Sequence, residues 1–284
     1  MKAPVLLPID APADEAGSCA LAALRLREGR WQQAAQRVAE ERPVALQYNG
    51  VSHAVMLATP ADLEDFAVGF SLSEGIVAAA HEVHDLDIES SGQGVTVAMK
   101  IAASRFDALK QRRRSLAGRT GCGLCGVDSL AQALPELTPL HSDAVFAVSA
   151  VLAAMQALRA HQPLHDETGA THAAGFADAQ GRLLCVREDV GRHNALDKVI
   201  GALARGRVDA TRGLVLITSR ASHEMVAKAA RAGIPLVAAV SGVTTLAAQT
   251  AHDTAVCLAG FARGDDLTAY AHAQRLAGAT APKA

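Results

Sequence analysis

A mixed α/β fold is predicted for this 284-residue chain because short apolar strands alternate with amphipathic helices after Pro139. Before Pro139 the pattern is one of strand pairs and a helix. Alternating strands and helices form a parallel or mixed sheet that is covered on both faces. We therefore expect a disordered tail at residues 1–20, a smaller α+β domain over residues 21–140 and an α/β domain over residues 141–284.

The first element is a predicted hairpin. Residues 44–48 and 51–56 are strand-like and flank Asn49-Gly50, which suits a type I′ turn. Thr59-Pro60 then opens a helix, with Thr59 at the cap and apolar residues at helical spacing after it. A further strand is expected at residues 95–99.

The second half is predicted to contain three helix–strand alternations after a pair of strands. Asn194 is expected to cap one helix and Gly233 to end another. The predicted elements are a helix at 145–158, strands at 172–176 and 183–186, a helix at 194–203, a strand at 214–217, a helix at 222–231, a strand at 235–240, a helix at 244–251 and a last strand at 255–258.

The composition limits the class of protein. Hydrophobic residues make up 50% of the chain but aromatic residues only 3%, so the core must consist of Ala, Val, Leu and Ile. The net charge of -2 gives no sign of a nucleic-acid or membrane partner. No apolar run reaches the roughly 18 residues of a transmembrane helix, and residues 1–7 lack the features of a signal peptide. We expect a cytoplasmic protein, and the apolar composition is compatible with a homodimer.

The most informative motif is a pair of cysteines, Cys122 and Cys125, in the glycine-rich run RTGCGLCG at residues 119–126. The glycines disfavour a helix and indicate a mobile loop. Nearby positive charge lowers the pKa of a thiol and makes it reactive. The cations that precede the motif are Lys110, Arg112, Arg113, Arg114 and Arg119.

Three hypotheses fit such a pair: half of a zinc site, a redox dithiol and a persulfide carrier. Structural zinc needs four ligands, and only His141 and His172 are candidates to complete the set through the fold. A thioredoxin-like dithiol needs a helix after the first cysteine, which Gly123 and Gly126 disfavour. The persulfide carrier fits best, and no structural metal is expected. The other core cysteines, Cys185 and Cys257, are expected to be inert.

Polar segments follow three predicted strands of the second half. They are residues 187–198, residues 218–224 and residues 260–266. If these strands are parallel, the segments meet at the edge where ligands of open α/β sheets bind. Arg192, Arg220 and Arg263 are then candidates to hold a phosphate, and we expect binding of GDP or GMP. The alternative is that these segments are solvated turns with surface ion pairs.

Taken together, these motifs resemble the formate dehydrogenase accessory sulfurtransferases, the FdhD family. The matching segments run in the family's order from about Pro43 to Arg275. They are FSLSEGI at 70–76, TGCGLCG at 120–126, REDVGRHNALDK at 187–198, TSRASHEM at 218–225 and GFAR at 260–263.

The resemblance implies a cytidine-deaminase-like α/β core and a defined activity. The family takes sulfur from a cysteine desulfurase as a persulfide. It passes this sulfur to the molybdenum of a bis-guanine-dinucleotide molybdopterin cofactor, which then enters the catalytic subunit of formate dehydrogenase. Cys122 matches the persulfide cysteine and Cys125 its partner. The stretch that matches the family's cofactor contacts is Phe261, Ala262, Arg263, Gly264, Asp265 and Asp266.

The chain departs from the family in its acidic residues near the C-terminus. Asp265 and Asp266 stand where the family often has glycine and a cation, and two carboxylates repel phosphates. The zinc signature of deaminases is absent, so no deaminase activity is expected. The alternatives to sulfur transfer are a molybdenum-cofactor chaperone without a covalent sulfur step and a thiol redox protein.

Overall fold

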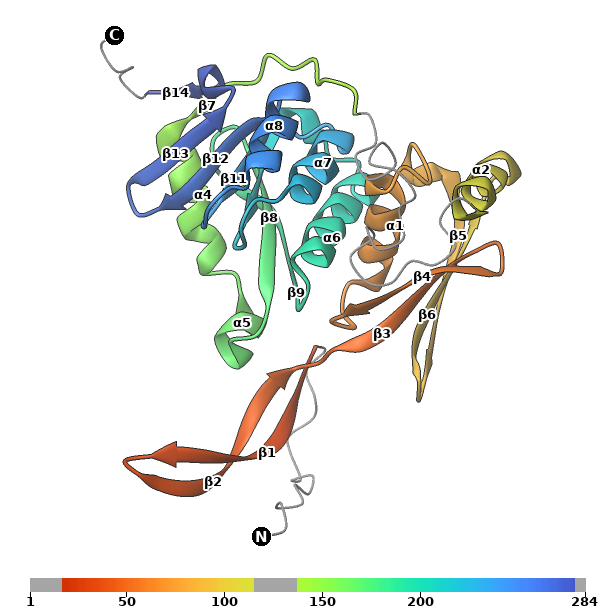
Figure 1. Ribbon diagram of the computed structural model, residues 1–284, viewed down its shortest axis with the longest axis vertical. Helices are drawn as coiled ribbons and strands as arrows, with labels where there is room; N and C mark the ends of the chain where they lie inside the picture. Colours follow the sequence, from red (N-terminus) through yellow and green to blue (C-terminus); the bar gives the residue numbers. More distant parts are fainter. Residues whose placement is uncertain (1–16, 115–136, 279–284) are drawn as a thin grey trace.

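The computed structural model describes residues 17–114 and 137–278, and its two main sheets enclose most of the described helices (Figure 1). In order from one side to the other, helix α4, a six-stranded sheet, helices α6 to α8, helix α1 and a four-stranded sheet form successive layers. The described structure is therefore mixed α/β, as the strand and helix pattern predicts.

The four-stranded sheet has the order β4-β3-β6-β5. Its strands are β3 (Arg42–Tyr48), β4 (Val51–Ala58), β5 (Val83–Ser91) and β6 (Gly94–Ile101). The predicted hairpin is confirmed: Asn49 and Gly50 have φ values of 48° and 80°, as a type I′ turn requires. Helix α1 (Leu63–Ser73) packs on one face, and the short 3₁₀ turn Ala80–Glu82 and helix α2 (Ala103–Arg114) complete this part.

Helix α1 begins later than predicted. Its N-cap is Asp62, at a φ of 54°, and Thr59 is not a cap. The Thr59 N–H donates to the Asp189 carboxylate at 3.0 Å, and the Thr59 carbonyl accepts from Lys198 at 3.1 Å. The expected cap is wrong because the peptide groups of Thr59 are bound by Asp189 and Lys198, which come 130 and 139 positions later in the chain.

The six-stranded sheet has the order β13-β12-β11-β10-β8-β9. Strands β10, β11 and β12 are parallel, β8 is antiparallel to β10, and β9 is antiparallel to β8. Strand β9 therefore runs in the direction of β10. The strands are β8 (His172–Asp178), β9 (Leu183–Asp189), β10 (Gly213–Ile217), β11 (Leu236–Ala239), β12 (Cys257–Arg263) and β13 (Asp266–Ala271).

The end of the second half differs from the prediction. The strand expected to be the last, at 255–258, is β12, which continues to Arg263 and turns back into β13. The segment Gly260–Arg263 is thus part of a strand with an irregular register and does not follow it. A single-sequence pattern misses this extension because glycine and alanine are depleted in strands.

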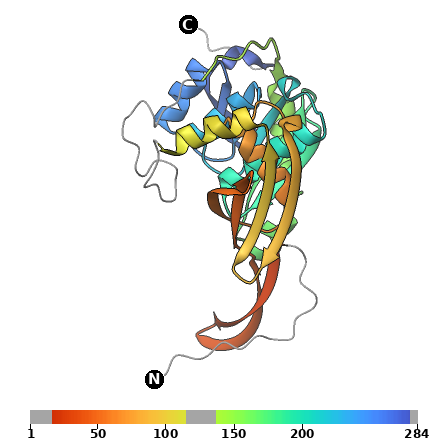
Figure 2. The same ribbon diagram turned by 90° about the vertical axis from the view of Figure 1, so that its right-hand side faces the viewer.

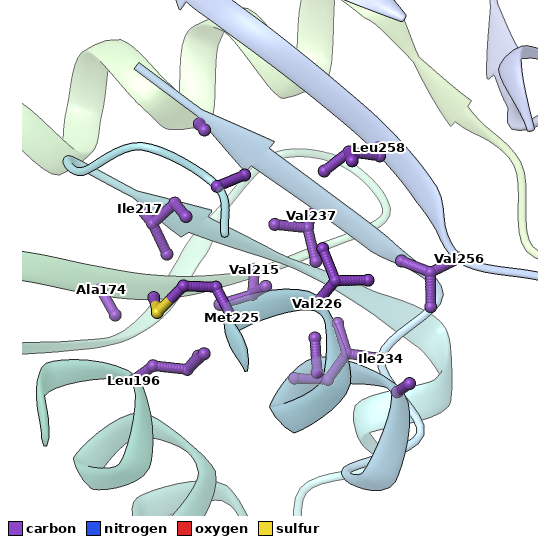
Figure 3. Packing of buried hydrophobic residues seen from close by; sticks show 14 of the residues in the cluster. Ala174, Leu196, Val215, Ile217, Met225, Val226, Ile234, Val237, Val256 and Leu258 are labelled. Atoms are coloured by element: carbon purple, nitrogen blue, oxygen red, sulfur yellow. The ribbon is translucent and has the colours of Figure 1, made fainter. Parts of the chain in front are cut away.

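Helices cover both faces of this sheet. The helices are α4 (Val148–Arg159), α5 (Pro163–Thr168), α6 (Arg192–Arg205), α7 (His223–Arg231) and α8 (Thr245–Asp253). Figure 3 shows the core beneath α7, where Val226 lies beside Val237 of β11. Short pieces complete the part: 3₁₀ turns at Ala210–Arg212 and Ala273–Arg275, and the parallel pair β7 (Phe146–Ala147) and β14 (Leu276–Ala277).

A hairpin that the sequence analysis misses projects from the body as an arm (Figures 1 and 2). It consists of β1 (Ser18–Arg27) and β2 (Arg30–Ala39), paired antiparallel along their whole length. Residues 18–20, expected in a disordered tail, belong to β1 instead.

Candidate functional site

Three strand-to-helix loops meet at one edge of the six-stranded sheet, and two of them, after β9 and β10, contain polar segments that the sequence predicts to meet there. The carboxyl ends of β9, β10 and β11 lie there and lead into α6, α7 and α8. The loops bind each other: the Ala221 N–H donates to the Gly242 carbonyl, and the Thr244 N–H donates to the Ala221 carbonyl, both at 3.1 Å. This edge brings Arg192 and Arg220 to the same end of the molecule.

Two helices open at this edge without a side-chain cap. The N-cap residues are Gly191 for α6, which has no side chain, and Ser222 for α7, whose hydroxyl accepts no hydrogen bond from its helix. The Nε atom of Arg192, the first residue of α6, is buried and makes no hydrogen bond within the described residues. At the start of α6 the helix dipole and the Arg192 guanidinium favour an anion, whereas the start of α7 already carries the Glu224 carboxylate.

A histidine and a glutamate join α6 to α7 here. His193 Nε2 lies 3.4 Å from Glu224 Oε2, and the Ser222 hydroxyl donates to the same oxygen at 2.8 Å. The neighbouring His193 ring, followed by the Ser222 hydroxyl, lowers the pKa of Glu224 to about 2. Burial, with Arg192 nearby, lowers the pKa of His172 at the start of β8. At neutral pH the Glu224 carboxylate is thus ionised and the His172 imidazole is neutral.

A cavity of about 400 Å³ lies on the α4 side of this edge. His172 and Thr218 line it together with His165, whose Nδ1 lies 2.9 Å from the Thr171 carbonyl. Its wall combines apolar side chains, such as Met155, Leu158 and Val240, with polar ones and the cation Arg159.

The predicted contact stretch at residues 261–266 forms the end of the β12–β13 hairpin. Phe261 has a φ of 52°, is 41% exposed, and its N–H donates to the Ser241 carbonyl at 3.1 Å. The hairpin end is thereby tied to the β11–α8 loop of the same edge. Arg263 lies over the Phe261 ring at 6.0 Å, whereas the Ala262 side chain is in the core and offers a ligand only its backbone.

The turn itself carries the two acidic residues. Gly264 has a φ of 59°, and Arg263 and Asp266 lie opposite each other in the backbone register of the two strands. Gly264, Asp265 and Asp266 are exposed. The two carboxylates thus lie at the end of the hairpin, while the edge loops carry Arg192 and Arg220.

The charged segment 187–198 has a structural role that sequence reasoning missed. Asp189 and Lys198 are fully buried and 2.7 Å apart, and Lys198 also donates to the Glu188 carbonyl. Asn194 is the third residue of α6 and does not cap it. Its side chain donates to Asp189 and to the Leu57 carbonyl, which explains the error.

A second buried network joins two of the motifs to helix α7. Lys228 of α7 binds Asp197 of α6 at 2.9 Å and donates to Ser73 and Glu74 at the end of α1. The Ser73 hydroxyl also donates to Asp197 at 2.6 Å. The segments FSLSEGI and REDVGRHNALDK therefore fasten α1 to α6. Nothing in a single sequence signals this, because charged residues are rarely buried.

The cysteine motif, with Cys122, Cys125 and Arg119, lies outside the described residues. The chain before it ends in α2, and the chain after it begins at Leu137, which lines a cavity of about 1190 Å³. Of the other cysteines, Cys257 is fully buried, and burial raises its pKa to about 12. Burial also raises the pKa of Cys185, which is half-buried. Among the described residues, no group of three potential ligands is placed to hold a metal ion.

The fold and the sequence define a mixed α/β protein that has two helix starts and two arginines at one sheet edge and a paired-cysteine motif in its sequence. The sequence profile of the FdhD/NarQ family matches residues 39–277, and the chain belongs to this family. No helix among the described residues is long and apolar enough to cross a membrane.

Related proteins cover almost the whole chain. A protein of Bordetella petrii named "Sulfur carrier protein FdhD" is 54% identical over 93% of this chain and 96% of its own length. A protein of the same name from Cupriavidus necator is 55% identical over 89% of this chain and 88% of its own length. The crystal structure of a Desulfotalea psychrophila protein, described as a formate dehydrogenase accessory protein, aligns with a TM-score of 0.72 and 25% identity. The alignment covers 92% of this chain and 99% of that one.

Proposed function

We propose that this protein is a sulfur carrier that supports formate dehydrogenase by transferring persulfide sulfur to its molybdenum cofactor. The observation that carries the proposal is the paired-cysteine motif in a chain 54% identical to a named sulfur carrier. A cytoplasmic cysteine desulfurase is the proposed donor. The catalytic subunit of formate dehydrogenase is the proposed recipient of the finished cofactor.

The proposed chemistry begins with a thiolate at Cys122. It attacks the terminal sulfur of the desulfurase persulfide, the sulfur–sulfur bond breaks, and the desulfurase leaves as a thiolate. Cys122 then carries the persulfide. Attack of the Cys125 thiolate on the inner sulfur of Cys122 forms a disulfide and releases HS⁻, so the dithiol supplies the two electrons. The proposed acceptor of this sulfide is the molybdenum.

The proposed cofactor-binding surface is the sheet edge with the β12–β13 hairpin. The uncapped starts of α6 and α7, with Arg192 and Arg220, support the binding of a guanine dinucleotide phosphate. Phe261 offers an exposed ring for a base, and Arg263 a cation beside it. Because the carboxylates of Asp265 and Asp266 repel phosphate, the proposed phosphate site is on the loops and not at the hairpin end.

The sulfur step is tested by mass spectrometry of the intact protein after incubation with a cysteine desulfurase and cysteine. We expect a gain of one or more sulfur atoms that a reductant removes. Cys122→Ala should lose support of formate dehydrogenase activity while remaining folded. Cys185→Ala and Cys257→Ala are the matched controls and should still load sulfur. Full activity of Cys122→Ala would rule the persulfide step out.

The binding step is tested by titrating the protein with GDP in a calorimeter. Arg192→Ala should weaken binding by about 1–3 kcal/mol, the usual loss for a hydrogen bond to a charged group. Arg263→Ala should have a similar effect. Arg182→Ala is the control, since Arg182 is exposed and paired with Asp178 at the opposite end of the strands. No binding at millimolar GDP would contradict this site.

The second candidate function is a cofactor chaperone without covalent sulfur transfer. The sheet edge favours it because its anion-binding groups do not depend on the cysteines. GDP binding together with a complete absence of protein-bound persulfide would select this alternative. A thiol redox protein would instead show a reversible Cys122–Cys125 disulfide and no nucleotide binding.

A further inference from the structure

The cavity of about 400 Å³ beside the sheet edge has both apolar and polar walls. Met155 and Leu158 of α4 belong to the apolar wall, and both side chains are buried. His172 and Thr218 contribute polar groups from the start of β8 and the end of β10. The volume is in the lower part of the roughly 300–1,000 Å³ that ligand pockets have. The cavity therefore has room for one ring system and not for a whole dinucleotide.

A buried glutamine at this cavity has an amide oxygen without a donor. Gln162 is 2% exposed, and its Oε1 makes no hydrogen bond within the described residues. It is the N-cap residue of α5, but its side chain does not cap that helix. A buried acceptor without a donor is unfavourable, and the last torsion of a glutamine turns easily. Gln162 is therefore suited to accept a hydrogen bond from a molecule in the cavity.

Three donors that line the same cavity are already bound to carboxylates. The Thr171 hydroxyl and the His165 backbone N–H both donate to Glu188 Oε1 at 2.8 Å. The Arg159 guanidinium donates to Asp166 at 2.6 Å. Turning any of these donors to Gln162 would break a charge-assisted hydrogen bond. We therefore expect the missing donor on a ligand.

The cavity adjoins the start of α6, where the phosphate site is proposed. Burial, and then the charge of Arg192, lowers the pKa of His172, so the Arg192 guanidinium lies near this wall of the cavity. A phosphate beside Arg192 and a ring in the cavity can thus belong to one molecule. The neutral His172 imidazole adds one donor and one acceptor nitrogen to the wall.

The 2-amino-4-oxopyrimidine ring has the donors that Gln162 lacks. Its 2-amino group and the adjacent ring N–H both donate, and its faces suit the apolar side chains of Met155 and Leu158. Guanine and pterin share this ring. The guanine-dinucleotide molybdopterin of the proposed function contains both of them.

We propose that this cavity binds the 2-amino-4-oxopyrimidine ring of guanine or pterin, with the Gln162 amide oxygen accepting a hydrogen bond from the 2-amino group. The inference rests on the proposed function, because it places one ring of the same cofactor. That cofactor has two guanines and two pterins, so the cavity and the exposed Phe261 receive different rings. A ring without the amino group leaves Gln162 unpaired and is rejected, which makes Gln162 a specificity-determining residue.

The experiment is a calorimetric titration of the full chain with two pairs of ligands. GDP and IDP differ only in the 2-amino group, and pterin and lumazine differ at the same position. In at least one pair, the wild type should bind the amino-bearing member about tenfold more tightly or better, as expected for a buried hydrogen bond. Gln162→Met should bind both members of that pair alike.

The variant and its control are matched in chemistry. Gln162→Met should fold, because it keeps the unbranched shape of the side chain and removes an amide oxygen that has no donor. Its thermal midpoint should be no lower than that of the wild type. Gln249→Met is the control, since Gln249 is exposed on α8 and bound to Asp253, and it should keep the wild-type preference.

Two results would overturn the inference: equal affinities of the wild type within both pairs, and a preference that Gln162→Met retains. If GDP binds in either case, the phosphate site of the proposed function stands and only the ring site is wrong. A preference for pterin over lumazine that depends on Gln162, without any binding of GDP, would support the cavity and contradict the phosphate site.

Discussion

At the scale of single residues, two lysine–aspartate pairs show how burial changes the meaning of an ion pair. Lys228 and Asp197 lie 2.9 Å apart with side chains 7% and 2% exposed. Lys100 and Asp85 lie 2.8 Å apart with side chains 72% and 58% exposed. The distances are almost equal, so the surroundings decide the energetic difference.

Lys228→Met should therefore destabilise the protein by about 3–5 kcal/mol, because it leaves the Asp197 carboxylate buried without its cation. Lys100→Met should cost no more than about 1 kcal/mol, since water screens the exposed pair. Urea denaturation of both variants measures the difference. Equal losses of stability would show that the buried network is not what fastens α1 to α6 and α7.

At the scale of elements, helices α1 and α6 approach each other through two glycines. A Cβ atom at Gly69 would lie 1.7 Å from the Asp197 carbonyl oxygen. A Cβ atom at Gly201 would lie 1.8 Å from the Asp65 carbonyl oxygen. Both obstacles are backbone atoms, which cannot move aside as a flexible side chain can.

Gly69→Ala should consequently lower the free energy of unfolding by about 3 kcal/mol or more, the upper range for overpacking a tight contact. Gly92→Ala is the control, because a Cβ at Gly92 meets nothing within 4 Å and its φ is not positive. Thermal denaturation should show a lower midpoint for Gly69→Ala alone. A wild-type midpoint for that variant would mean that the helices separate at little cost.

The success of sequence-based prediction follows the range of the interactions. The turn at Asn49-Gly50 was predictable because both residues determine it locally, and the sheet edge because parallel strands share a direction. The caps at Thr59 and Asn194 were wrong because partners more than 100 residues away claim their polar groups. The arm was missed because its strands are rich in Ala, Leu, Gln and Arg, which carry little strand signal.

At the scale of the whole molecule, polar contacts cross the expected domain boundary near residue 140. Arg187 and Arg205 of the second half both bind Asp65 of α1. Lys198 and Lys228 complete their hydrogen bonds with Thr59, Ser73 and Glu74 of the first half. The two halves thus contain separate sheets but share one buried polar interface.

Residues 141–278 expressed alone should therefore fail to unfold cooperatively, because buried lysines and the face of α6 that packs on α1 would meet water. The full chain should show a single transition. Circular dichroism during heating, with the full chain as the reference, measures both. A fragment with a sharp transition near that of the full chain would show that the halves are independent.

The residues that form these contacts are far apart in the sequence, and this has a consequence for synthesis on the ribosome. Asp65 leaves the exit tunnel 140 residues before Arg205, one of its two guanidinium partners. At typical translation rates this gap lasts on the order of ten seconds. Once β6 has also emerged, the nascent four-stranded sheet and α1 present an unfinished apolar and acidic surface until α6 is made, and we expect the early chain to be a client for molecular chaperones.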